Sequence, residues 1–346
     1  MTLLDTLLAT DKSIHLQNPG TSHALVSDFG SPLAEIQSLD QGEQVLAPLG
    51  HYGLLGISGE EATDFLQKQL TNDLLTLPTE GARHAAWCTA KGRMLASFVV
   101  FRAENGYRLL VSRPLAEPIQ KRLQMYILRA KVKANDLSSQ YEVFGLAGHG
   151  VAKTLKNMGL PVPQSSESSL GAISLDGLTV ISLEPQRFLL VTAAESAPSL
   201  WTNLAAFAKP VGVDAWRYSD IRAGFPLITA ETQEAFVPQM VNFDRLGGVS
   251  FKKGCYPGQE IVARTHYLGK VKRHLYRITT SESFSAGDLL FSPLTPDQSA
   301  GQVVSASLAP DQGWIGLASV LEAAVEDLRL SDISGQKVNV SSLAGT

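Results

Sequence analysis

A single cysteine in a cationic, glycine-rich stretch is the feature best suited to chemistry. Residues 253–260 read KGCYPGQE, and the Pro-Gly pair favours a turn from which a helix can begin at Gln259. Cys255 is thus expected just before a helix N-terminus, close to Lys252 and Lys253, where the helix dipole and the cations both favour a thiolate. A cysteine packed inertly at a tight turn is the alternative interpretation. Two glycines and two lysines around the sulfur favour the reactive thiol.

Cysteine and histidine counts exclude several other kinds of site. The chain has two cysteines, Cys88 and Cys255, which excludes a disulfide-stapled scaffold, a four-cysteine zinc site and a complete four-cysteine iron–sulfur site. The seven histidines show no H-x-x-x-H pair, so we predict no metal site. Cys88 lies in an apolar run and is expected to pack there.

Charge is concentrated around the cysteine. Residues 245–277 contain eight Lys or Arg and one acid, a net charge of +7 in a chain whose net charge is −4. Such a stretch is either a solvated face or a surface for an anionic partner such as tRNA. It matches no RNA-binding motif that we recognise, although four aromatic residues interrupt it: Phe251, Tyr256, Tyr267 and Tyr276.

Composition and the remaining motifs narrow the class of protein. With 346 residues, 44% hydrophobic and 18% charged, the chain can form two or three folded domains. The glycine-rich loop at 145–150 lacks the dinucleotide and P-loop spacings, and no G-x-S-x-G elbow is present. We identify no export signal and no apolar window long enough for a membrane span, so we expect a cytoplasmic protein without membrane contact.

Hydrophobic patterning predicts an α+β fold. A strand, a helix, a hairpin, a helix and a strand are followed by a second set in similar order, which indicates two pseudo-repeated α+β units with antiparallel sheets. Glycine and proline punctuate short apolar runs from residue 271 onward, a pattern typical of a small β-barrel. We therefore expect a helical lead-in at 1–45, an α+β body at 46–270 with a break near 137–171, and a barrel at 271–346. Predicted strands are 53–57, 85–88, 94–102, 107–112, 141–147, 172–175, 178–183 and 188–191; predicted helices begin near 58 and 259 and cover 115–128 and 199–208.

Several segments together resemble the YgfZ family of folate-binding proteins, relatives of the glycine-cleavage T-protein (aminomethyltransferase). The cysteine block matches K-G-C-[Y/F]-x-G-Q-E, a highly specific motif of that family. Further matches are 220–226 (DIRAGFP), 236–242 (FVPQMVN), 246–251 (LGGVSF) and 261–264 (IVAR), with weaker ones at Gly59, 65–67 (FLQ), 70–73 (LTND) and 89–93 (TAKGR).

The resemblance implies a fold and a set of site residues. It implies a T-protein-like, three-lobed folate-binding body around a central cavity, followed by the C-terminal β-barrel. Two aromatic positions that line the family's folate site fall on Tyr52 and Trp216, and aromatic faces suit the stacking of pterin and benzoyl rings. Cys255 would be the functional thiol, acting with Lys253. The residues implied for cofactor binding and for the surroundings of the thiol are Gln259, Glu260 and Arg264.

The implied function is that of an accessory protein. A protein of this family would bind tetrahydrofolate and support iron–sulfur cluster assembly or repair, and thereby tRNA modification, with cluster-assembly or cluster-containing proteins as partners. The T-protein has an acidic residue after the glycine of a strand turn, whereas residues 92–97 (GRMLAS) contain no carboxylate. A general acid or base for one-carbon transfer is thus missing there. A folate-dependent aminomethyl- or methyltransferase and a nucleic-acid-binding module remain the alternatives, and turnover is left open.

Overall fold

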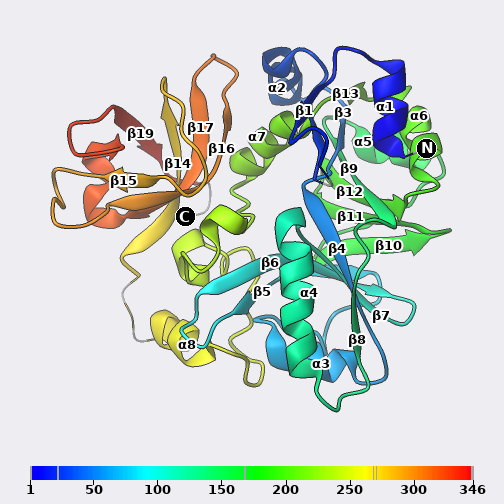
Figure 1. Cartoon of the computed structure of the whole chain (residues 1–346), viewed down its shortest axis with the longest axis horizontal. Helices are drawn as coiled ribbons and strands as arrows, with labels where there is room; N and C mark the ends of the chain where they lie inside the picture. Colours follow the sequence, from blue (N-terminus) through cyan, green and yellow to red (C-terminus); the bar gives the residue numbers. More distant parts are fainter. Residues whose placement is uncertain (1, 22, 167–168, 268, 270, 344–346) are drawn as a thin grey trace. The chain divides into compact units, whose positions relative to one another are not determined.

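A computed structural model describes residues 2–21, 23–166, 169–267, 269 and 271–343. The chain forms two compact units (Figure 1). The first unit comprises residues 1–66, 74–84 and 98–216, and the second comprises 67–73, 85–97 and 217–346. The chain passes from one unit to the other within a pair of neighbouring strands, β5 (Gly81–Cys88) and β6 (Met94–Ala103).

An eleven-stranded sheet organises the α+β body, in the order β13-β3-β9-β12-β11-β10-β5-β6-β7-β4-β8. The pairs β3–β9, β9–β12, β12–β11, β11–β10, β10–β5, β6–β7, β7–β4 and β4–β8 are antiparallel, whereas the pair β13–β3 is parallel. The predicted α+β class is confirmed, and the two pseudo-repeated sets of strands share one continuous sheet. Besides β5 and β6, its strands are β3 (Val45–Pro48), β4 (Tyr52–Ser58), β7 (Gly106–Ser112), β8 (Lys133–Asp136), β9 (Tyr141–Ala147), β10 (Leu170–Leu175), β11 (Leu178–Glu184), β12 (Arg187–Ala193) and β13 (Lys209–Pro210).

Helices of the first unit pack on the sheet through alternate strand residues, which point to the same face. In β12, Phe188 and Leu190 belong to a core cluster with Trp201 of α6 (Ala197–Ala205) and Leu155 of α5 (Val151–Asn157). The helix α4 (Arg113–Ile127) packs on β4, β7 and β8, and α3 (Ala62–Gln69) follows β4 in the chain.

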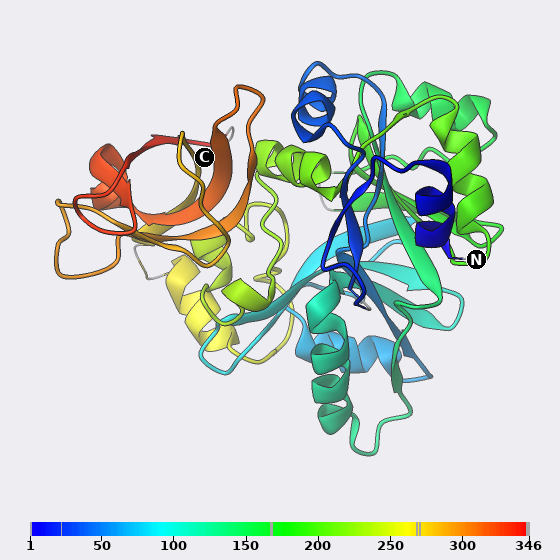
Figure 2. The ribbon, with the colours of Figure 1, turned by 45° about the horizontal axis from the view of Figure 1, so that its top comes forward.

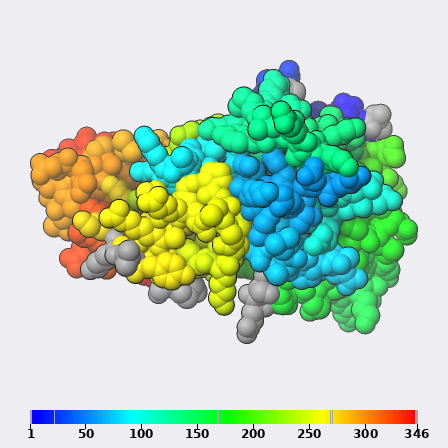
Figure 3. Space-filling model, turned by 90° about the horizontal axis from the view of Figure 1, so that it is seen from below, coloured from blue at the N-terminus to red at the C-terminus, as the bar shows by residue number. Residues whose placement is uncertain are grey.

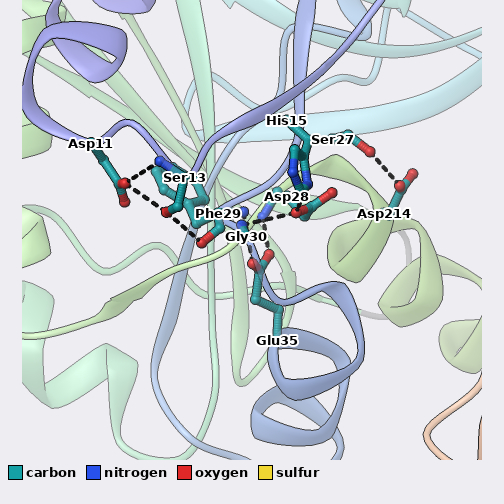
Figure 4. Close-up of polar contacts among 10 residues, drawn as sticks. Asp11, Ser13, His15, Ser27, Asp28, Phe29, Gly30, Glu35 and Asp214 are labelled. Atoms are coloured by element: carbon teal, nitrogen blue, oxygen red, sulfur yellow. Dashed lines mark hydrogen bonds and ion pairs between the residues drawn. The ribbon is translucent and has the colours of Figure 1, made fainter.

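The first 45 residues contain more structure than the predicted short helix and polar lead-in. The helix α1 (Leu3–Thr10) is followed by the hairpin β1 (His15–Gln17) and β2 (Leu25–Asp28), and then by α2 (Pro32–Asp40). Carboxylates organise this segment (Figure 4). Asp28 accepts hydrogen bonds from the His15 ring at 2.7 Å and from the Gly30 amide at 2.8 Å.

Two further carboxylates hold the hairpin and α2 to the rest of the first unit. Glu35 accepts the amides of Phe29 and Gly212, and its burial raises the pKa of the carboxyl. Asp214, in the first turn of α7 (Val213–Ala223), accepts the Ser27 hydroxyl at 2.7 Å and the Gln17 amide at 2.9 Å. Such side-chain bonds leave no hydrophobic periodicity, which explains why patterning alone misses these elements.

The second unit contains the predicted C-terminal β-barrel, which is confirmed. Six strands close in the order β14-β17-β16-β15-β18-β19, and Figure 2 looks into the ring that they form. Their core is apolar, with Ile278, Leu290 and Val320 fully buried. The strands are β14 (Arg273–Thr280), β15 (Leu289–Phe291), β16 (Gly301–Leu308), β17 (Trp314–Leu321), β18 (Leu328–Leu330) and β19 (Lys337–Ser341).

Short helices precede or accompany the barrel. They are the 3₁₀ helices η1 (Ala230–Thr232), η2 (Pro238–Val241) and η3 (Glu322–Asp327), and the α-helix α8 (Gln259–Tyr267) that follows the cysteine block. Over the part of the chain that the structure describes, every helix is too short or too polar to span a bilayer.

Candidate functional site

The predicted site residues divide between the two units. Tyr52 and Trp216 belong to the first unit, whereas all five predicted residues of the cysteine block and α8 belong to the second: Lys253, Cys255, Gln259, Glu260 and Arg264. The segment that carries the second group is yellow in Figure 3, where it forms part of the molecular surface.

Cys255 is exposed on a loop that leads into α8. As predicted, the Pro-Gly pair makes a turn and the helix begins at Gln259. Gly258 has φ +79°, and a Cβ there would lie 2.3 Å from the carbonyl oxygen of Thr89. Only glycine therefore fits where the helix start packs against the turn between β5 and β6. The same turn reaches α8 again at Gly92, whose Cβ position is 3.1 Å from Ile261.

Lys253 anchors the loop from inside the second unit. Its ammonium is buried and donates to the main-chain carbonyls of Gln67 and Leu70, and it lies 5.1 Å from the centre of the Tyr256 ring. Burial lowers the pKa of Lys253 to about 8, against the opposing effect of nearby Asp73. The hydrogen bonds of this cation are thus made to carbonyls in and just after the last turn of α3, a role that the sequence does not predict. Its effect on the thiol stays a prediction.

Two neighbouring polar side chains fix the loop that precedes the cysteine block. The Thr71 hydroxyl donates to the Gly248 carbonyl and the Asn72 amide donates to the Gly247 carbonyl, both at 2.6 Å. The Ser250 amide in turn donates to the Thr71 carbonyl at 3.0 Å. Segments 70–73 and 246–251, which the resemblance matches separately, are therefore bonded to each other. Their shared family match was the available signal for this contact.

The three predicted residues of α8 differ in their surroundings. Gln259 is half-buried, and its side-chain amide donates to the Lys253 carbonyl at 3.4 Å. Glu260 and Arg264 are exposed. The helix itself is held from its buried side, because the Val262 carbonyl accepts the side-chain amide of Gln239 at 2.8 Å. Their parts in cofactor binding stay predictions.

The two thiols are in opposite environments. Cys88 is 2% exposed at the end of β5, and burial raises the pKa of its thiol to about 12. It therefore remains protonated and inaccessible at neutral pH, as its apolar surroundings predicted. Cys255 is the thiol that a partner in solution can reach.

Trp216 occupies the core of the first unit, on α7. Its indole is fully buried and packs against Gly145 of β9, where a Cβ would lie 2.4 Å from two ring carbons. The Arg187 guanidinium lies 5.1 Å from a ring centre of the indole. Among the described residues, the buried indole N–H has no hydrogen-bond partner. An acceptor on a bound molecule would satisfy this donor.

Tyr52 begins β4 and is 4% exposed, with its ring 4.4 Å from that of His51. The Tyr52 amide donates to the Leu49 carbonyl at 3.0 Å, and the Leu49 amide donates to the Val143 carbonyl of β9 at 2.8 Å, so the start of β4 is linked to the strand beneath Trp216. The roles of both aromatic residues at a folate stay predictions.

The stretch 92–97 contains bonding groups other than carboxylates. The Arg93 guanidinium donates to the Ala235 carbonyl, and the Ser97 hydroxyl accepts the Ile228 amide at 3.0 Å. These contacts tie the start of β6 to the segment 228–235. Across the residues that the structure describes, no group of three or more His, Cys, Asp or Glu is arranged to hold a metal ion.

Comparison with known proteins yields one family model and closely similar curated relatives. Residues 44–249, more than half of the chain, match the model of the GCVT N-terminal domain. The chain is 34% identical over 238 residues to the tRNA-modifying protein YgfZ of Escherichia coli O157:H7, covering 69% of this chain and 72% of the relative. It is also 34% identical over 245 residues to the tRNA-modifying protein YgfZ of Yersinia enterocolitica, covering 68% and 71%.

Among solved structures, the fold is similar to that of the glycine cleavage system aminomethyltransferase T from Bartonella henselae. The TM-score is 0.80 at 17% identity, with 99% of this chain and 96% of that chain covered. At this identity the likeness shows the shared fold alone.

Proposed function

Because the chain belongs to the YgfZ family, whose body is a GCVT N-terminal domain, we propose that it is a folate-binding accessory protein for iron–sulfur cluster assembly or repair. Through cluster enzymes it would support tRNA modification, in keeping with the name of its relatives. Cys255 acts as the functional thiol and tetrahydrofolate as the bound cofactor, in a cytoplasmic setting. The observation that carries the proposal is an exposed thiol on a loop held by buried hydrogen bonds.

The chemistry of the cysteine block supports assistance to clusters that other proteins hold. Iron–sulfur clusters are bound by several thiolates, typically four. This chain has two cysteines, of which Cys88 is buried and protonated. A lone accessible thiol can bind a cluster, or the protein that donates a cluster, at one coordination position. The partner protein then supplies the other ligands. The partners proposed are therefore cluster-assembly or cluster-containing proteins.

Folate binding is supported in the first unit by the indole N–H of Trp216, a buried donor that has no partner among the described residues. Pterins carry carbonyl and ring-nitrogen acceptors that would satisfy it. Because Gly145 and Arg187 already contact the indole, we propose that the N–H edge meets the ligand. When bound, tetrahydrofolate supplies one-carbon or reducing chemistry. Tyr52, Gln259, Glu260 and Arg264 complete the proposed set of cofactor-binding residues.

The thiol is tested by genetic complementation of a cluster-maintenance defect. Cys255→Ser changes one exposed atom and is expected to abolish complementation while leaving the thermal unfolding midpoint unchanged. Cys88→Ser is the matched control, in which any loss should accompany a lowered midpoint, because the buried site would gain a hydroxyl. Full complementation by Cys255→Ser would refute the proposed thiol role.

The folate is tested separately by calorimetry with tetrahydrofolate. Trp216→Phe removes the indole N–H and retains an aromatic ring, so we expect binding to weaken about tenfold for one lost buried hydrogen bond. Trp201→Phe, in the core of the same unit, is the control and should bind as the wild type does. Absence of binding to the wild-type protein would refute the cofactor. Equal binding by the two variants would refute the contribution of Trp216.

A further inference from the structure

Three aromatic side chains form a cluster at the surface of the second unit, here called the aromatic platform: Phe251, His266 and Tyr267. The rings of Phe251 and His266 are stacked, with centroids 3.7 Å apart and planes 14° from parallel. Tyr267 stands edge-on to both, at 6.1 Å from Phe251 and 4.8 Å from His266. Phe251 precedes the cysteine loop and the other two residues end α8, so the platform brackets the loop in sequence.

The platform is accessible, which a purely structural cluster would not require. Tyr267 is 65% exposed and His266 is exposed, whereas Phe251 is half-buried beneath them. Burying aromatic rings is a main source of folding stability, and these rings are largely left in water. Two of the three residues therefore contribute less to the core than their size allows, and they offer π surface to a ligand.

Two exposed cations lie next to platform residues. Lys252 adjoins Phe251 in the chain, and Arg264 lies one helical turn before Tyr267; both are exposed. Glu260 is the acid within 245–277, and Lys270 of that segment lies outside the described residues. The exposed charges next to the platform residues in the chain are thus mainly positive.

We propose that the aromatic platform binds an unpaired nucleobase of RNA, while Lys252 and Arg264 contact the adjoining phosphates. Flat π surfaces among cations are what single-stranded nucleic acid uses, because each base can stack and each phosphate needs a counter-charge. In duplex RNA the faces of the bases are covered by stacking, so a duplex would contact only the cations and not the aromatic rings. The inference rests on the link to tRNA modification in the proposed function and deepens it, since it adds a direct RNA contact and names its residues and the state of the RNA.

Direct binding tests the platform. Fluorescence anisotropy compares a labelled single-stranded RNA of about ten nucleotides with a duplex of equal length, because single-strand sites span about 4–16 nucleotides. We expect tighter binding to the single strand. Tyr267→Ala should weaken it about fivefold to hundredfold, the equivalent of ~1–3 kcal/mol for one stacked base. Tyr267→Phe should bind as the wild type does, since it retains the ring.

Two further variants complete the design. Tyr126→Ala removes a tyrosine that is 47% exposed on α4 of the other unit, and it should leave RNA affinity unchanged. Arg264→Ala should weaken single strand and duplex alike and lower the slope of affinity against salt by about one. This separates the contribution of charge from that of stacking.

The outcomes distinguish the platform from the proposed function. Equal affinity for duplex and single strand, unchanged binding by Tyr267→Ala, or no binding at low salt would each overturn the platform. If that occurs while Cys255→Ser still abolishes complementation, the proposed function stands without this RNA contact. If Cys255→Ser complements fully, the thiol role fails whatever the RNA result.

Discussion

Replacing Lys253 with methionine removes a buried charge and keeps most of the side-chain volume. Lys253 is 9% exposed, and its ammonium donates to the carbonyls of Gln67 and Leu70. At pH 7 the variant loses a costly desolvated charge but leaves two carbonyls without this donor. Each unsatisfied buried acceptor costs about 1–3 kcal/mol, so the two effects oppose each other. The pH dependence of stability separates them.

The magnitude follows from the pKa of Lys253, which burial lowers from 10.5 to about 8. Between these values the folded protein has released a proton that the unfolded chain still holds, so rising pH favours the folded state. One pKa unit corresponds to about 1.36 kcal/mol, and with an allowance for residual solvent access the wild type should gain about 2–3 kcal/mol relative to Lys253→Met. The neutral amine retains two N–H donors for the two carbonyls.

Urea unfolding at intervals between pH 7 and 10.5, under reducing conditions, measures this gain. Groups common to both proteins cancel when the free energies of unfolding are subtracted at each pH. Lys252→Met, at the exposed neighbouring lysine, reports the effect of removing one surface charge. A wild-type curve that stays parallel to that of Lys253→Met would refute the buried-cation argument. A fall in the stability of the wild type relative to Lys253→Met as the pH rises would refute it as well.

The remaining predictions concern the thiols and the packing of Trp216. In the native protein one thiol, Cys255, should react rapidly with a thiol-specific chromogenic reagent, and Cys88 should react only after unfolding; two equally fast equivalents would contradict the burial of Cys88. Gly145→Ala should destabilise the first unit by about 1–3 kcal/mol, because its Cβ would overlap the indole, and Gly177→Ala at an open turn should cost less; calorimetric unfolding decides between them.

Sequence patterning predicts the elements that consist of short apolar runs between turn signals. The strand β9 is predicted with the bounds that it has, and the hairpin at Asn105-Gly106 connects β6 to β7 as expected. The helix α7 is missed for a physical reason. Trp216, Ser219 and Asp220 are all buried, so the helix has no polar face from which a periodicity of 3.6 could be recognised.

The candidate site likewise has features that the sequence predicts and features that it does not. The turn, the start of α8 and the exposure of Cys255 follow from local chemistry at Pro257 and Gly258, which the sequence displays directly. The burial of Lys253 does not, because its partners are main-chain carbonyls almost two hundred residues earlier. Every residue has a main-chain carbonyl, so no residue pattern predicts which carbonyls accept the hydrogen bonds of Lys253.

The hydrogen bonds of the second unit also indicate what the family motif is for. Thr71 and Asn72 donate to the carbonyls of two glycines, and Lys253 donates to carbonyls at the end of α3. Gly258 leaves room for the β5–β6 turn. These residues position the loop, whereas Cys255 extends from it into solvent. Substitution at an anchoring residue should therefore lower stability and function together. Substitution of Cys255 should lower function alone, because the architecture around the thiol does not depend on the sulfur.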